Sequence, residues 1–155
     1  MTPVNIVRIL NRIRPKRIED LKGKIAYRAI GIGAFRAAYV LDNQVVIKFP
    51  ISWVSWGCRR HAQREIAAIR RIQQLKKMKH LRRYIPKVYY MDYSNGVIVM
   101  DRLCRKSGSG ETEFTSAVER MFQDSFSRRT CDIYFQNMGQ DLNGNWKLFD
   151  LGIVY

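Results

Sequence analysis

The stretch from residue 26 to residue 48 limits the fold most tightly, because it alternates apolar runs with turn signals and ends on a charge. Its strand-like runs are residues 26–30, 35–41 and 45–47. The glycines Gly31 and Gly33 and the pair Asp42-Asn43 are typical of the turns between such runs. We therefore expect three consecutive antiparallel strands, the last of them buried and followed by Lys48.

The rest of the chain indicates helices alternating with hairpins. Residues 3–13 and 59–79 have the periodicity of amphipathic helices, and the longer one carries Ala62, Ile66, Ile69 and Ile72 on one face. Further expected elements are a hairpin over 88–100, a helix over 111–126 and a hairpin over 136–149. The pattern predicts an α+β fold with a mainly antiparallel sheet.

A short Ser/Gly-rich stretch at 106–110 suggests a boundary between two parts of the chain. We expect three segments: a basic amphipathic N-terminal extension over 1–23, an N-terminal lobe over 24–105 and a minimal C-terminal lobe over 106–155.

Charge and composition restrict the compartment and the partners. The formal net charge is +15, which attracts nucleic acid, anionic membrane or an acidic protein, although it also fits a solvated helix face. No apolar run is long enough for a transmembrane helix. The three cysteines have no metal-binding spacing and cannot all pair in disulfides, so we expect a reducing cytoplasm.

Lys48 is unusual because it ends the apolar run Val45-Val46-Ile47. A buried ammonium needs a partner, and Glu65 is a plausible one, since it lies beside the inward face of the expected long helix. Taken separately, each residue also fits an ordinary surface position.

Together these residues resemble the protein kinase superfamily. The family signature is matched in order by Gly31 and Gly33, Val45 to Lys48, Glu65, Asp132 with Asn137, and Asp150-Leu151-Gly152. The resemblance implies a protein-kinase-like α+β fold. It would have a five-stranded antiparallel N-lobe sheet with one long helix, and a minimal C-lobe of about one helix and a β-hairpin.

The resemblance also implies ATP and Mg²⁺ as cofactors and a role for each matching residue. Gly31 and Gly33 would cover the phosphates, Lys48 held by Glu65 would bind them, and Asp132 would be the catalytic base. The remaining implied positions are Asn137 and Asp150 for the metal, Ala38 and Val46 around the adenine, and Asp101 to Leu103 as the hinge.

The chain also departs from the family pattern. Arg36 replaces the third glycine of the loop, where it could contact phosphate or point outward. Only three residues follow Gly152, so we expect no activation segment and no peptide-docking helices. In these respects the sequence is similar to bacterial type III effector kinases of the OspG and NleH type, and to small bacteriophage kinase-like proteins.

These features favour an ATP-dependent kinase acting on serine or threonine hydroxyls of proteins. Such an enzyme would depend on an acidic partner or substrate, for example a ubiquitin-conjugating-enzyme complex or a host protein. The alternative is a catalytically weak, kinase-fold binding module that docks on and modulates an acidic partner. Nucleic-acid binding is a third possibility, which the charge permits without any recognised motif.

Overall fold

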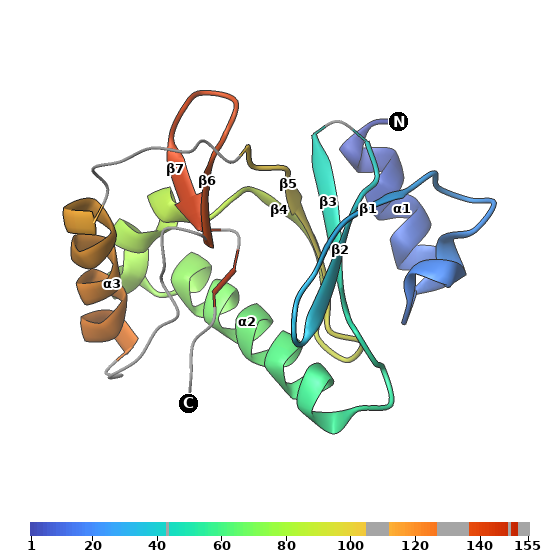
Figure 1. The fold of residues 1–155 in the computed structure, drawn as a ribbon, viewed down its shortest axis with the longest axis horizontal. Helices are drawn as coiled ribbons and strands as arrows, with labels where there is room; N and C mark the ends of the chain where they lie inside the picture. The colour runs from blue at the N-terminus through green and yellow to red at the C-terminus, as the bar shows by residue number, and fades with distance from the viewer. Residues whose placement is uncertain (43, 105–111, 127–136, 149, 152–155) are drawn as a thin grey trace. The chain divides into compact units, whose positions relative to one another are not determined.

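The computed structural model describes residues 1–42, 44–104, 112–126, 137–148 and 150–151 (Figure 1). The chain forms two compact units. Unit 1 comprises Met1–Ile66 and Lys87–Arg102, and unit 2 comprises Ala67–Pro86 and Leu103–Tyr155. The boundary falls inside helix α2 (Trp56–Gln74), so each unit includes part of that helix.

Unit 1 is built on a five-stranded sheet in which all neighbouring strands are antiparallel. The strands are β1 (Arg28–Ile32), β2 (Arg36–Val40), β3 (Val45–Pro50), β4 (Val88–Asp92) and β5 (Val97–Asp101). Their order is β1-β2-β3-β5-β4, so β3 is central. The predicted α+β fold, with a five-stranded antiparallel sheet, a long helix and a small C-terminal part, is confirmed.

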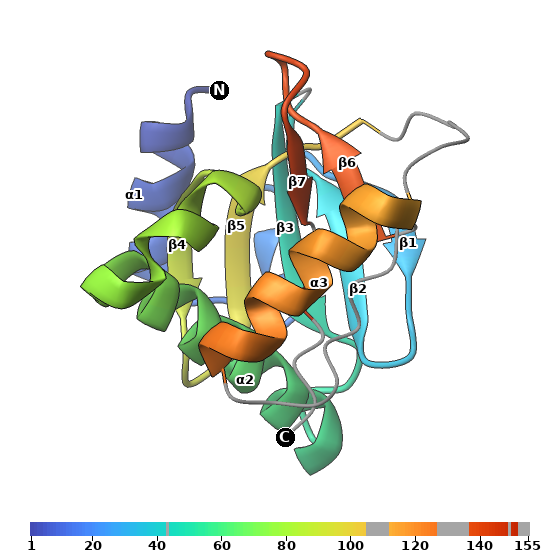
Figure 2. The same ribbon diagram turned by 90° about the vertical axis from the view of Figure 1, so that its left-hand side faces the viewer.

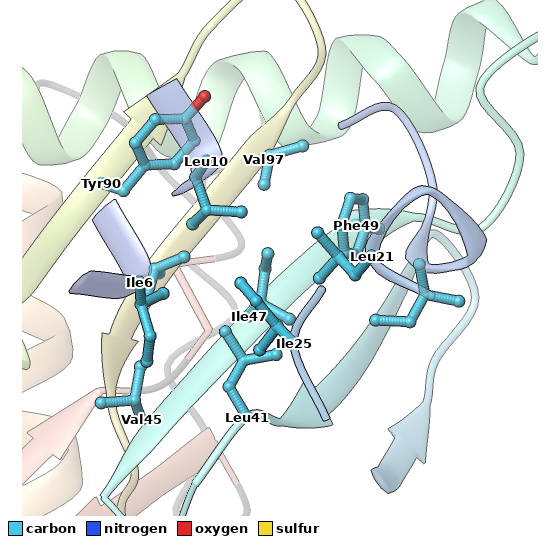
Figure 3. Close-up of a cluster of buried hydrophobic side chains, with 12 residues drawn as sticks. Ile6, Leu10, Leu21, Ile25, Leu41, Val45, Ile47, Phe49, Tyr90 and Val97 are labelled. Carbon is cyan, nitrogen blue, oxygen red and sulfur yellow. The ribbon is translucent and has the colours of Figure 1, made fainter. Parts of the chain in front are cut away.

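Alternation along β3 divides its side chains between the two faces of the sheet. Val45, Ile47 and Phe49 point to one face and belong to a single buried cluster. Helix α1 (Pro3–Ile13) and the short 3₁₀ helix η1 (Ile18–Leu21) cover that face, as the close-up in Figure 3 shows. Val46 and Lys48 therefore point to the opposite face.

Helix α1 has the expected bounds, and its ends explain them. The Thr2 side chain accepts a hydrogen bond from the Asn5 amide at 3.3 Å, and Pro3 occupies the first turn. Arg14 ends the helix with a left-handed φ of 45°. Ile6 and Leu10 are four residues apart and fully buried, and burying each stabilises the fold by about 1.5–3 kcal/mol.

A polar cluster fixes α1 beside β4, its neighbour in Figure 2. The Arg14 guanidinium donates to both carboxylate oxygens of Asp92 at 3.2 Å, and the Asn95 side chain donates to Asp92 and to the Arg14 carbonyl. Burial raises the pKa of Asp92, but these hydrogen bonds outweigh it, so the pKa is lowered. The N-terminal segment is thereby part of the packed core of unit 1.

The predicted helix over 59–79 is wrong at its C-terminal end, which lies in unit 2. The α-helix ends at Gln74, and a 3₁₀ helix, η2 (Lys76–Tyr84), follows it. Met78, Leu81 and Tyr84 recur every three residues and are buried. A 3₁₀ helix has three residues per turn, so this spacing gathers them on one side.

The other elements of unit 2 match the predicted helix and hairpin. They are α3 (Thr112–Phe126), β6 (Met138–Gln140) and β7 (Trp146–Leu148). The His80 ring lies 3.1 Å from the Ser125 hydroxyl, which ties η2 to α3. None of the helices in the described ranges is long and apolar enough to cross a membrane.

Candidate functional site

The sheet face turned away from α1 carries Lys48, the charged residue predicted to follow the apolar run of β3. Ala38 of β2 lies directly opposite Lys48 of β3, and Arg36 lies opposite Pro50. Directly opposed residues of an antiparallel pair project to the same face. Arg36, Ala38, Val46 and Lys48 therefore share one face of the sheet.

Three charged side chains meet on this face. The Lys48 ammonium lies 2.8 Å from Oε1 of Glu65, and Nη1 of Arg36 lies 2.7 Å from Oε2 of the same carboxylate. Lys48 and Arg36 are each 6% exposed and Glu65 is 1% exposed. The predicted partnership of Lys48 with Glu65 is present in the structure.

The electrostatics of Glu65 follow from this double pairing. Burial alone raises the pKa of the Glu65 carboxyl, because it penalises the charged form. The charges of Lys48 and Arg36 outweigh burial, so the pKa lies below its ordinary value. Glu65 is thus held as a carboxylate between two cations.

Arg36 does not adopt either of the orientations expected from the sequence. It neither points outward nor leaves its guanidinium open to a phosphate, because Nη1 donates to Glu65 and Nη2 donates to the Lys48 carbonyl at 3.3 Å. Sequence reasoning missed this contact. The contact depends on the register of the β2–β3 pair, which places residue 36 two positions before the partner of Lys48 and which the sequence does not show.

Gly31 lies near the end of β1, paired with Ala38 of β2, and Gly33 begins the turn that joins the two strands. A Cβ built on Gly31 would meet no heavy atom within 4 Å, so the space beside it is open. The Gly33 amide donates to the Arg36 carbonyl at 2.8 Å and closes the turn. Beside them, the Phe35 ring stacks on His61 of α2 with centroids 4.8 Å apart.

The residues predicted to surround an adenine are only partly available for that role. Val46 is buried and Ala38 is half-buried, on the same face as Lys48. The amides of Asp101 and Arg102 donate to the carbonyls of Lys87 and Gln44, at 2.9 and 2.7 Å. A purine would have to use other backbone groups of the 101–103 segment.

The Asp101 side chain is also engaged within unit 1. The Tyr89 hydroxyl donates to its carboxylate at 2.6 Å. Burial and this hydrogen bond raise the pKa of Tyr89 to about 12. The contact fixes the end of β5, two residues before Leu103, where unit 2 resumes.

The two predicted metal ligands, Asn137 and Asp150, both lie in unit 2. Oδ1 of Asp150 is buried and has no hydrogen-bond partner among the described residues. Asn137 is half-buried immediately before β6, and Asp132 lies outside the described residues. A buried carboxylate oxygen without a donor suits a hard cation such as Mg²⁺, although no group of three or more such ligands gathers within the described ranges.

Comparison with solved structures shows weak likeness to known proteins. No protein-family model and no curated protein matches the chain. A solved structure, the ternary complex of streptomycin, ATP and APH(2″)-IIa, is similar at 18% identity with a TM-score of 0.44. The match covers 85% of this chain and 42% of that one, so the chain spans less than half the length of that protein.

Proposed function

We propose that the chain is an ATP- and Mg²⁺-dependent phosphotransferase with a kinase-like arrangement. One observation carries the proposal: Lys48 on the central strand is buried and ion-paired with Glu65 on the following helix, at 2.8 Å. Burying an ammonium has a large free-energy cost, so a buried lysine indicates a functional role rather than a contribution to solubility. Binding phosphate oxygens is the purpose that the kinase resemblance assigns to it.

The proposed reaction transfers the γ-phosphoryl group of ATP to a hydroxyl. The hydroxyl oxygen forms a bond to the γ-phosphorus, the bond from that phosphorus to the β–γ bridging oxygen breaks, and ADP leaves. Asp132 orients the hydroxyl and accepts its proton. Asn137 and Asp150 would hold Mg²⁺, which would supply positive charge to neutralise the phosphates. Lys48 holds the α- and β-phosphates, and Gly31 and Gly33 cover them.

The finer parts of the proposal rest on the sequence resemblance. The acceptor is a serine or threonine of a protein, residues 24–105 act as the N-lobe, and residues 106–155 act as the C-lobe. The similarity to effector kinases of the OspG and NleH type, or to bacteriophage kinase-like proteins, remains a prediction of the same kind.

Replacing Lys48 with methionine should reduce phosphate transfer from labelled ATP by about 100-fold, because it removes one preorganised charge while keeping the bulk of the side chain. The assay uses the full chain with Mg²⁺, scoring autophosphorylation and transfer to casein, with ATP binding followed by thermal shift. Lys22→Met is the matched control, since Lys22 is exposed and should leave transfer unchanged. Tight ATP binding by the unaltered chain with no transfer to any acceptor would contradict the kinase proposal.

A second candidate function is binding of an acidic protein without catalysis, and one observation favours it. Between residues 59 and 87 there are seven arginines and four lysines, and the only acidic residue is Glu65, which is buried. On η2, Lys76, Lys77 and Lys79 are exposed. A surface of one sign attracts an oppositely charged partner.

Reversing these three lysines to glutamate should weaken retention on immobilised polyglutamate at physiological ionic strength, because it reverses part of the attracting charge. Asp132→Ala should leave retention unchanged, since the binding function does not use the proposed base. Equal retention of the charge-reversed chain would contradict this candidate. Stronger retention on polyuridylate than on polyglutamate would favour nucleic acid instead.

A further inference from the structure

Arg36 is a buried arginine at the position where the resemblance expects a glycine, and it contacts both halves of the Lys48–Glu65 pair. We propose that Arg36 is a positioning residue that couples the glycine turn to the Lys48–Glu65 pair, so that closing the turn and aligning Lys48 occur together. This inference rests on the proposed function, because the turn and Lys48 are assigned to the same nucleotide.

The first argument is the connectivity of the guanidinium. Arg36 stands at the start of β2, its Nη1 donates to Glu65 of α2, and its Nη2 donates to the Lys48 carbonyl of β3. One rigid, planar group thus links two strands and a helix. A lysine at this position could donate to one of these two acceptors, but its ammonium lacks the planar set of donors that reaches both.

The second argument concerns the orientation of the Glu65 carboxylate. Oε1 accepts from Lys48 and Oε2 accepts from Arg36, so both oxygens are engaged. Turning the carboxylate away from Lys48 would also break the contact with Arg36.

The third argument is that the backbone of the same residue closes the turn. The Arg36 carbonyl accepts from the Gly33 amide at 2.8 Å, while its side chain holds Glu65. A neighbouring contact acts in the same direction, since Phe35 stacks on His61, one helical turn before Glu65 on α2. Movement of the turn is therefore transmitted to α2, and a ligand that orders the turn also orders the ion pair.

The test compares Arg36→Met and Arg36→Lys with Arg28→Met, a matched control on exposed β1. We expect Arg36→Met to lower kcat/KM for ATP by about tenfold, a typical size for coupling between two sites. Arg36→Lys should lie between Arg36→Met and the unaltered chain, and Arg28→Met should match the unaltered chain. Carbon-13 NMR of the glutamate carboxyls gives a readout separate from activity, and Arg36→Met should raise the pKa of Glu65.

Three results would overturn the proposed coupling, and they differ in what they imply for the proposed function. Unaltered kcat/KM and Glu65 pKa in Arg36→Met, in a chain that binds ATP normally, would overturn the coupling and leave the proposed function intact. A loss of ATP affinity with no change in the Glu65 pKa would make Arg36 a phosphate ligand and would also overturn it. Failure of the unaltered chain to bind ATP would instead remove the proposed function, and the coupling with it.

Discussion

Replacing Glu65 with alanine is expected to lower the free energy of unfolding by about 3–5 kcal/mol, the usual cost of removing one member of a buried ion pair. Lys48 and Arg36 would both lose the carboxylate that now compensates them, in a region where each is 6% exposed. Urea denaturation of the full chain measures the effect, with a comparison of midpoints and slopes to exclude a change in the denatured state.

Two further variants separate charge from packing. Glu19→Ala removes an exposed glutamate of η1 and should change stability by no more than about 0.5 kcal/mol. The triple variant Glu65→Leu, Lys48→Met, Arg36→Met should be more stable than Glu65→Ala, because it contains no uncompensated buried charge. A triple variant no more stable than Glu65→Ala would show that lost packing, not charge, causes the destabilisation.

Replacing Gly96 with alanine is expected to destabilise the protein by about 2–5 kcal/mol, from two separate causes. Gly96 has a φ of +69°, which residues with a Cβ adopt at a cost. A Cβ built there would also lie 2.7 Å from Cβ of Ala62 on α2 and 3.0 Å from Cγ of Pro50. Contacts this short force the helix or the β4–β5 turn to move.

Gly23 provides a matched control for the clash, because its φ is +74° but a Cβ there would meet no heavy atom within 4 Å. Gly23→Ala should therefore show the backbone cost alone, about 1–2 kcal/mol. Thermal or urea unfolding of both variants gives the difference. Equal destabilisation at the two sites would mean that α2 moves away from the added Cβ at no cost in free energy.

Since Ala62 precedes Glu65 by one turn, we also expect weaker ATP binding in Gly96→Ala.

Much of the fold could be predicted from local patterns. Strands β2 to β5 follow from short apolar runs bounded by turn residues, and α1 follows from its apolar stripe. The exception is η2, since the predicted helix continued a 3.6-residue period to residue 79, past Leu75, which is 36% exposed. The buried residues beyond it, Met78, Leu81 and Tyr84, are spaced by three, and that regularity was the signal for a 3₁₀ helix.

The Lys48–Glu65 part of the site could be predicted because a charged residue follows an apolar strand. A lysine after three apolar strand residues requires a counter-ion, and Glu65 was the acidic residue near the inward helix face. The sharing of that carboxylate by Arg36 depends on strand register and on the reach of a long side chain, neither of which a glycine-to-arginine replacement reveals. The roles of Asp132, Asn137 and Asp150 remain predictions.

The packing of α1 has a consequence for the order in which the chain folds. Ile6 and Leu10 share one buried cluster with Val97 and Val99 of β5, which are synthesised much later. Contacts between distant parts of a sequence form slowly, because a long loop must close before they are made. During translation α1 therefore cannot complete its packing until β5 has left the ribosome, even though the part of the cluster up to Phe49 is available earlier.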